Sequence, residues 1–235
     1  MPLRSTLSIA ALIALAPQLA GAQAAIPQSP APVAAHAGAD APTAADLALR
    51  ALYEREWAWR QQEFAQEKID GRWQASSRLP SVAAEDWERR VAYWTQVLAE
   101  LDAIDVAQLS PGERVNAAVF RAMVEADHAS TEWRTWEAPF NSDSFFWGYF
   151  NPSQPYAREA EWERLLGRLR DVPTYFDQQI ANMERGLDRG WSVPRASIEG
   201  RDRTLEPYTR TDAGNPFLAT FDAIPASVPE PRRSQ

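Results

Sequence analysis

Cysteine is absent from the sequence, and histidine occurs only twice, as His36 and His128. Without cysteine the chain can form no disulfide, no thiolate metal site and no cysteine nucleophile. The two histidines are too far apart for one helix to present both at the spacing that zinc hydrolases use. These absences predict that the chain by itself contains no catalytic residue of these kinds, no metal site and no cofactor.

Positive charge is also in short supply. Lysine and arginine number 24 against 32 aspartates and glutamates, which gives a net charge of -8 and a pI near 4.9. Nucleic acids and anionic membranes bind basic surfaces, so neither is expected as a partner. A glycine-rich phosphate loop and a Gly-x-Ser-x-Gly elbow are missing too, which leaves nucleotide binding and elbow-type serine hydrolysis without support.

Apolar side chains, in contrast, are plentiful. They make up 45% of the 235 residues, and ten residues are tryptophan. This composition excludes a disordered chain, and the length suits one domain or the front part of a larger one. The many acidic residues, such as Glu54 and Glu85, lie beside arginines in the pattern of solvated helical ion pairs rather than of a hydrolytic carboxylate pair.

The N-terminus is typical of an export signal. Arg4 precedes an apolar run over residues 7–15, and Ala22-Gln23-Ala24 follows. Because the run is shorter than the about 20 residues that span a bilayer, it indicates a signal peptide rather than an anchor. We expect residues 1–24 to be removed, leaving a periplasmic or secreted protein without membrane attachment. Residues 25–45, rich in alanine and proline, are expected to form a disordered linker.

Apolar periodicity predicts a helical domain over residues 46–200. A first helix, over residues 44–67, begins with the capping-box spacing of Thr43 and Asp46. A second helix follows Pro80 and carries apolar residues at alternating steps of four and three, expected in the core rather than stacked on a cofactor. These residues are Trp87, Val91, Trp94, Leu98 and Leu101.

A third helix is predicted at Ser110, where Ser110 to Glu113 reads as a full capping box with proline at the first helical position. Near its end His128 is expected to interact with the helix terminus rather than to act in catalysis. The expected buried face of this helix consists of Val115, Val119, Ala122, Met123 and Ala126.

Two further helical patterns, over residues 162–169 and 176–187, are separated by Pro173, which is predicted to start a new helix or to kink one. Residues 193–199 favour an extended segment. Residues 201–235 are expected to be irregular, and their uncapped end indicates a truncated chain. The predicted fold class is therefore all-α, a mainly α, bundle-like array of several helices with an aromatic-rich irregular loop.

That loop lies between Glu137 and Pro155, where six large aromatic residues are interrupted by proline, glycine and asparagine. An exposed loop of this composition would promote aggregation, so it either packs inward or lines a groove, and the sequence favours neither alternative. Within it Asn141, Ser142 and Asp143 form a polar cluster. The cluster either orients a ligand or makes local turn and cap hydrogen bonds.

Several motifs in this part of the chain resemble the N-terminal half of the bacterial family called domain of unknown function 885. The motifs are Pro-Phe-Asn-Ser-Asp-Ser at residues 139–144, the stretch over residues 169–187 and Gly-Trp-Ser-Val-Pro-Arg at residues 190–195. The likeness covers residues 45–230, and residues 171–195 are its most specific part.

The resemblance implies a mostly helical, zinc-metallopeptidase-like protein, often exported, with a His-Glu-x-x-Pro-Gly-His type motif that binds zinc. This chain contains no such motif. It is therefore expected to be the exported N-terminal fragment of such a protein, an incomplete part of a larger helical fold that lacks the catalytic half and is inactive alone. Zinc is expected only in full-length relatives.

The resemblance also points to partners and to a site. Asn141, Ser142, Asp143 and Arg195 match family positions and are the candidate substrate-binding residues. The expected partner is a peptide substrate or the missing C-terminal half. The alternative is a free-standing periplasmic helical module that binds a peptide or protein partner through the aromatic loop. A carbohydrate-binding or carbohydrate-hydrolysing helical protein is a third alternative.

Overall fold

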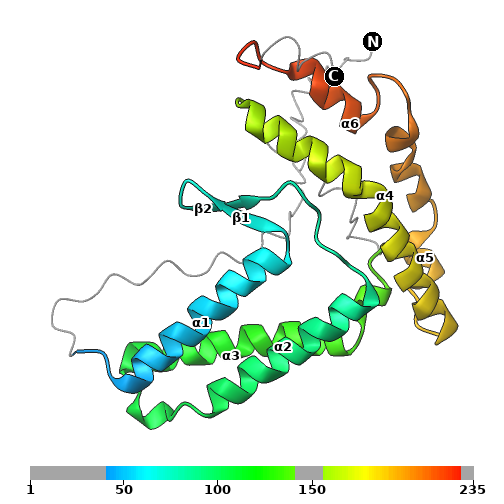
Figure 1. The fold of residues 1–235 in the computed structure, drawn as a ribbon. Helices are drawn as coiled ribbons and strands as arrows, with labels where there is room; N and C mark the ends of the chain where they lie inside the picture. The colour runs from blue at the N-terminus through cyan, green and yellow to red at the C-terminus, as the bar shows by residue number, and fades with distance from the viewer. Residues whose placement is uncertain (1–40, 141–155, 229–235) are drawn as a thin grey trace, which may run out of the picture. The chain divides into compact units, whose positions relative to one another are not determined.

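The computed structural model describes residues 41–140 and 156–228. Contacts between residues divide the chain into two units, residues 1–41 and 42–235, and every element below belongs to the second unit. The described residues are mainly helical and contain one two-stranded sheet, which confirms the predicted all-α class (Figure 1). None of the helices in these two ranges combines the length and the hydropathy that crossing a bilayer requires.

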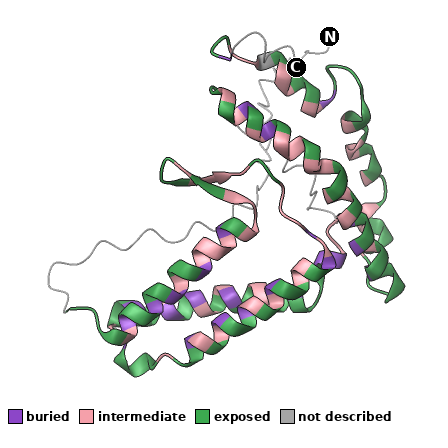
Figure 2. Cartoon of the chain, viewed as in Figure 1, coloured by how far each residue is buried: buried purple, intermediate pink, exposed green. Residues whose placement is uncertain are grey.

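Helices α1 (Ala44–Glu63), α2 (Ala84–Asp102) and α3 (Pro111–Glu132) lie side by side and enclose the main hydrophobic core (Figure 1). Figure 2 shows buried and exposed positions alternating along them, as amphipathic helices require. The predicted stripe of α2 is confirmed, because Trp94 and Leu101 are buried and the other three residues are half-buried. The centre of the core consists of Leu49, Trp94, Val97, Leu101 and Val124.

The predicted capping box of α1 is present. The hydroxyl of Thr43 accepts a hydrogen bond from the Asp46 backbone, and the Asp46 carboxylate accepts one from the Thr43 backbone, both at 3.0 Å. The same carboxylate accepts the Ser110 backbone N–H at 2.9 Å. Asp46 is 1% exposed and therefore ties the start of α1 to the start of α3.

The first helix ends earlier than predicted, at Glu63, because a β-hairpin follows it. Strands β1 (Gln66–Ile69) and β2 (Arg72–Ala75) pair antiparallel. Asp70 and Gly71 connect them with φ values of 50° and 78°, the left-handed conformations that a tight two-residue turn needs. The sequence analysis missed this hairpin.

Two predictions for α3 are wrong. Ser110 makes no side-chain cap hydrogen bond. The Glu113 side chain bonds Arg50 of α1 at 2.6 Å, and the Ser110 backbone N–H bonds Asp46, so neither half of the capping box forms. The predicted buried face is also incorrect: Val115 is 63% and Val119 45% exposed. The face of α3 that packs on α1 and α2 carries Ala117, Phe120 and Val124. Phe120 contacts Tyr53 of α1, with ring centroids 6.2 Å apart.

Helix α4 (Glu159–Asp188) is continuous across Pro173. Of the two alternatives predicted for Pro173, the start of a new helix is therefore wrong. Figure 1 shows the ribbon of α4 bending part-way along its length, which is the other alternative, a kink. The N-terminal half of α4 buries Trp162 and Leu165 against Val228. The C-terminal half is joined to the segment before α2, because Asn182 donates to the Val82 carbonyl at 2.6 Å.

The segment after α4 is helical rather than extended. Residues 195–198 form the short helix α5 (Arg195–Ile198), in which the Glu199 backbone donates to the Arg195 carbonyl at 2.9 Å. This corrects the extended segment predicted for residues 193–199: Pro194, with φ -56° and ψ 137°, is extended, but the helix begins at the next residue. Further single turns lead to α6 (Pro216–Ala219), which Asn215 caps by accepting the Phe217 backbone N–H.

Candidate functional site

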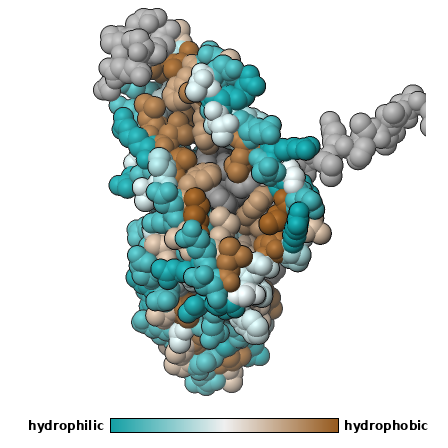
Figure 3. Space-filling view, turned by 90° about the vertical axis from the view of Figure 1, so that its right-hand side faces the viewer, coloured by the Kyte–Doolittle hydropathy of each residue, from teal (hydrophilic) through white to brown (hydrophobic). Residues whose placement is uncertain are grey.

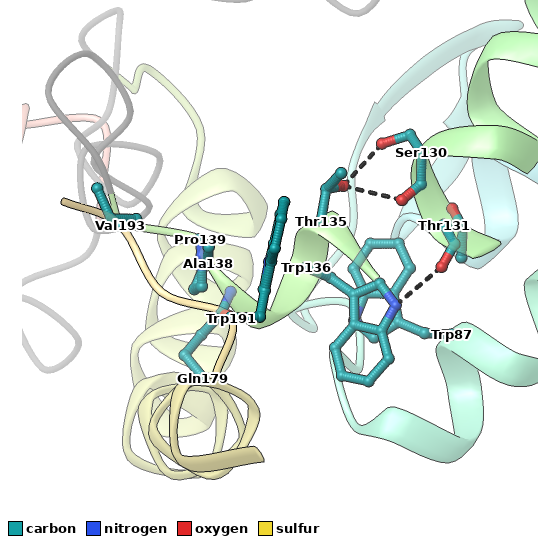
Figure 4. A pocket seen from close by; sticks show the side chains of 10 residues that line it. All are labelled: Trp87, Ser130, Thr131, Thr135, Trp136, Ala138, Pro139, Gln179, Trp191 and Val193. Atoms are coloured by element: carbon teal, nitrogen blue, oxygen red, sulfur yellow. Dashed lines mark hydrogen bonds between the residues drawn. The ribbon is translucent and has the colours of Figure 1, made fainter. Parts of the chain in front are cut away.

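A cavity of about 460 Å³ lies where α2, the end of α3, α4 and two connecting segments meet (Figure 4). The connecting segments are the 3-10 turn η2 (Thr135–Glu137) with the two residues after it, and residues 191–193. Ligand sites in proteins commonly have about 300–1,000 Å³ and mainly apolar walls. The lining residues are Trp87, Ser130, Thr131, Thr135, Trp136, Ala138, Pro139, Gln179, Trp191 and Val193.

One wall is a rigid pair of indoles. The rings of Trp87 and Trp136 are nearly parallel, at 6°, with centroids 6.2 Å apart. Each indole N–H is used within the protein: Trp87 donates to the Val82 carbonyl at 3.1 Å and Trp136 to the Thr131 carbonyl at 3.2 Å. Because both rings are anchored, this wall needs no rearrangement to accept a ligand.

A buried cation supports this wall. The guanidinium carbon of Arg90 lies 4.2 Å from the centroid of Trp87, and the Arg90 side chain is fully buried. Burial lowers the pKa of Arg90, and the carboxylate of Glu63 at 2.9 Å acts in the opposite direction. The π-system of Trp87 is therefore already engaged by a positive charge.

The opposite wall is the indole of Trp191, which is 44% exposed. Figure 4 shows this ring standing between the Trp136 side of the cavity and the Pro139 and Val193 side. The Trp191 backbone donates to the Gly186 carbonyl at 2.7 Å, which closes the end of α4 and sets the position of the ring. The guanidinium carbon of Arg189 lies 5.9 Å from the ring centroid.

Glu137 connects the two walls. It is 2% exposed, and its carboxylate is paired with Arg189 of the α4 terminus and lies 3.6 Å from Arg134. Arg189 and Arg134 are 42% and 48% exposed, but loss of their charge would leave the buried Glu137 carboxylate unpaired, so the Glu137–Arg189 pair joins η2 to the end of α4.

Most polar groups that line the cavity are already bonded within the protein. The Thr135 hydroxyl bonds the Ser130 carbonyl and hydroxyl at 3.0 and 2.8 Å, and the Thr131 hydroxyl donates to the Asp127 carbonyl at 2.8 Å. Gln179 is different. It is 5% exposed, its NH₂ donates to the Tyr175 hydroxyl at 3.2 Å, and its amide oxygen accepts no hydrogen bond within the described ranges. The cavity therefore offers one free acceptor, the Gln179 amide oxygen, among apolar walls.

Four residues were predicted from the sequence to bind substrate. Asn141, Ser142 and Asp143 lie outside the described residues. Arg195 begins α5 with its side chain 88% exposed and 3.7 Å from Glu199, and it does not line the cavity. The substrate-binding role of these four residues stays a prediction. Of the aromatic loop, Ala138 and Pro139 line the cavity.

The residues present do not fit a zinc site. In the described parts of the chain no group of three histidine, aspartate or glutamate side chains is placed to hold a metal ion. The ring nitrogens of His128 lie 2.9 Å from the Thr95 hydroxyl of α2 and 3.8 Å from the Glu132 carboxylate, so these contacts join side chains and do not cap the carbonyls at the end of α3. No chemical step of this chain is therefore assigned to a metal.

Comparison with known proteins gives one match. A family model described as "Bacterial protein of unknown function (DUF885)" matches residues 65–234. No curated protein and no solved structure matches the chain.

Proposed function

The chain belongs to the DUF885 family of bacterial proteins, and from this premise we propose that it is the peptide-binding, non-catalytic part of an exported, metallopeptidase-like protein. Zinc would be held by residues outside these 235, because His36 and His128 are too far apart in sequence for one helix to present both to a zinc ion. Residues 1–24 would direct export.

The observation that carries the proposal is the indole-walled cavity with the free Gln179 oxygen. Trp136 and Trp191 both line the cavity, so a flat apolar group that enters it can contact their rings. Such aromatic contacts stabilise binding by about 0.5–1.5 kcal/mol beyond area burial. A backbone N–H of the same ligand can donate to the Gln179 amide oxygen, which accepts no hydrogen bond within the described ranges. An aromatic side chain on a peptide supplies both groups.

Two alternatives fit the cavity less well. A sugar presents many hydroxyls, but the hydroxyls of Ser130, Thr131 and Thr135 already bond the protein. A cation would stack on the indoles, but Arg90 and Arg189 already lie against Trp87 and Trp191. The ligand group is therefore neutral and aromatic.

Other exposed apolar residues bear on whether the chain acts alone. Ile180 and Leu187 of α4 are 46% and 63% exposed. Both belong to the apolar pattern over residues 176–187 that predicts this part of the helix. Figure 3 shows apolar side chains gathered along the middle of one face of the molecule. Uncovered apolar residues favour a missing half over the free-standing module.

Calorimetry with capped tripeptides tests the proposal. The chain is titrated with acetyl-Ala-Phe-Ala-amide and with acetyl-Ala-Ala-Ala-amide. We expect measurable binding of the phenylalanine peptide only, and Trp191→Ala should weaken it by about tenfold, or about 1.4 kcal/mol. Trp133→Ala is the matched control, because Trp133 is 73% exposed and does not line the cavity.

Equal affinity for the two peptides, or equal loss in both variants, would contradict the proposal. Hydrolysis of either peptide by the purified chain would refute its non-catalytic part. A glucose or oligosaccharide titration that gives heat where the peptides give none would favour the carbohydrate alternative.

A further inference from the structure

Helix α3 is apolar on two opposite sides. Its inner side packs Ala117, Phe120 and Val124 into the core. Its outer side carries Val115 at 63%, Val119 at 45% and Trp133, the residue after its last turn, at 73% exposure. The helical repeat places four more exposed residues on this outer face: Ala118, Ala122, Ala126 and Ala129.

A row of charges flanks the outer face of α3. Arg114, Arg121, Glu125 and Glu132 are separated by close to whole numbers of turns, so they lie on one side of the helix. Both arginines are in the N-terminal half and both glutamates are in the C-terminal half. The row is symmetric in position and opposite in sign about Met123: Arg114 and Glu132 are equally far from it, and so are Arg121 and Glu125.

We propose that the outer face of α3 is a homodimer interface in which α3 packs antiparallel against α3 of a second copy. In a two-fold antiparallel pair the flanking rows of the two helices meet with their directions reversed. Arg114 then faces Glu132 of the second copy, and Arg121 faces Glu125 of the second copy. A parallel two-fold pair would place the two rows on opposite sides of the interface, where they cannot meet, so only the antiparallel arrangement lets these charges pair.

The apolar residues are arranged about a centre one residue further along, which is a shift of about 1.5 Å on the helix axis. Val115 and Trp133 are equally far from Val124, as are Ala122 and Ala126. An antiparallel pair therefore places the large Trp133 against the smaller Val115, and alanine against alanine near the two-fold axis. Small residues there let the helices approach closely, and the large residue fills the space at each end.

A second copy explains the charge order better than another partner does. The remainder of a longer chain or an unrelated protein could cover an apolar face, but neither requires charges that complement themselves. Within one chain, Arg114 donates to the Leu109 and Ala107 carbonyls at 2.9 and 3.2 Å. Glu132 lies 3.8 Å from His128. Arg121 lies 2.5 Å from Asp102 and 3.5 Å from Glu125, in pairs whose acidic partners are 65% and 55% exposed and which contribute little by themselves.

Sedimentation velocity over a range of concentrations tests the proposal with the purified chain. We expect a concentration-dependent dimer that weakens with salt, because exposed ion pairs are screened. Ala122→Glu places two carboxylates near the axis and should weaken the dimer by roughly tenfold or more. Leu47→Glu, the same substitution at a residue of α1 that is 55% exposed, should leave the dimer unchanged.

A mixing experiment tests the antiparallel pairing itself. Arg114→Glu places glutamates opposite each other and Glu132→Arg places arginines opposite each other, so each variant alone should be largely monomeric. An equimolar mixture should dimerise, because every flanking pair then joins opposite charges.

A wild-type chain that stays monomeric at all concentrations would overturn the proposal, as would a mixture that remains monomeric while both variants melt cooperatively. If Arg114→Glu fails to fold, the comparison of Ala122→Glu with Leu47→Glu still decides. Equal dimerisation of those two variants would place the interface elsewhere.

Discussion

The missing side chain of Gly186 allows the cavity to form. A β-carbon at this position would lie 2.7 Å from the Trp191 carbonyl oxygen and 2.9 Å from the Glu137 carbonyl oxygen. Both neighbours are backbone atoms, which cannot rotate away. Gly186 therefore lets the turn that carries Trp136 approach the end of α4 and the Trp191 segment closely.

Gly186→Ala is expected to destabilise the protein by about 1–3 kcal/mol, the usual cost of overpacking. This exceeds the gain of up to about 1 kcal/mol that alanine brings to a helix. Urea unfolding measures the change. Gly112→Ala in the first turn of α3 is the control, because its β-carbon meets nothing within 4 Å and should be neutral or stabilising. A Gly186→Ala protein as stable as wild type would show that the close approach is not required.

Single residues also show why the cavity could not be predicted. Trp87 was expected in the core with Trp94, yet only Trp94 is fully enclosed, and Trp87 lines the cavity and stacks on Trp136. Gln179 lies in a helix with nothing in its neighbours to mark it. These residues come together only through the packing of segments far apart in sequence, which periodicity does not report.

Asp46 joins the N-termini of helices α1 and α3. The Ser110 backbone hydrogen bond lowers the pKa of Asp46 below its usual value, and the bond from Thr43 acts in the same direction. A carboxylate whose pKa is lower in the folded than in the unfolded state stabilises the fold above the unfolded value. That stability is lost as the pH falls through the folded value.

Asp46→Asn is therefore expected to destabilise the protein at pH 7, because a neutral amide replaces the charged acceptor of two backbone hydrogen bonds. The difference from wild type should shrink as the pH falls below about 4, near the unfolded pKa of aspartate. Urea unfolding at pH 7 and pH 3 measures it. Asp188→Asn, at an exposed residue, should show no such pH dependence. A difference of equal size at both pH values would contradict the account.

The buried face of a helix could be predicted from the sequence where the helix has only one apolar face. The stripe of α2 has a single apolar face, and the prediction of that face is confirmed. Helix α3 has two apolar faces, so periodicity could not tell which one packs, and the larger Phe120 decided it. The hairpin was missed although Asp70-Gly71 is a strong turn signal, because the helical pattern before it was extended too far.

At the scale of the whole molecule, composition and periodicity were sufficient for the helical class, and the motifs for the family. The site required the three-dimensional arrangement. We propose different explanations for the exposed apolar faces of α3 and α4: a second copy for α3 and, as part of the proposed function, the rest of a longer protein for α4. The exposed fractions of Val115 and Leu187 are equal at 63%, so charge pattern rather than exposure distinguishes the two faces.

Fluorine NMR of the protein labelled with 5-fluorotryptophan tests the central claim that the indole-walled cavity binds an aromatic peptide side chain. Each resonance is assigned by replacing one tryptophan at a time. Addition of acetyl-Ala-Phe-Ala-amide should shift the signals of Trp87, Trp136 and Trp191 and leave that of Trp133 unchanged, because only the first three line the cavity. Unchanged cavity signals at a peptide concentration that saturates binding in calorimetry would contradict the account.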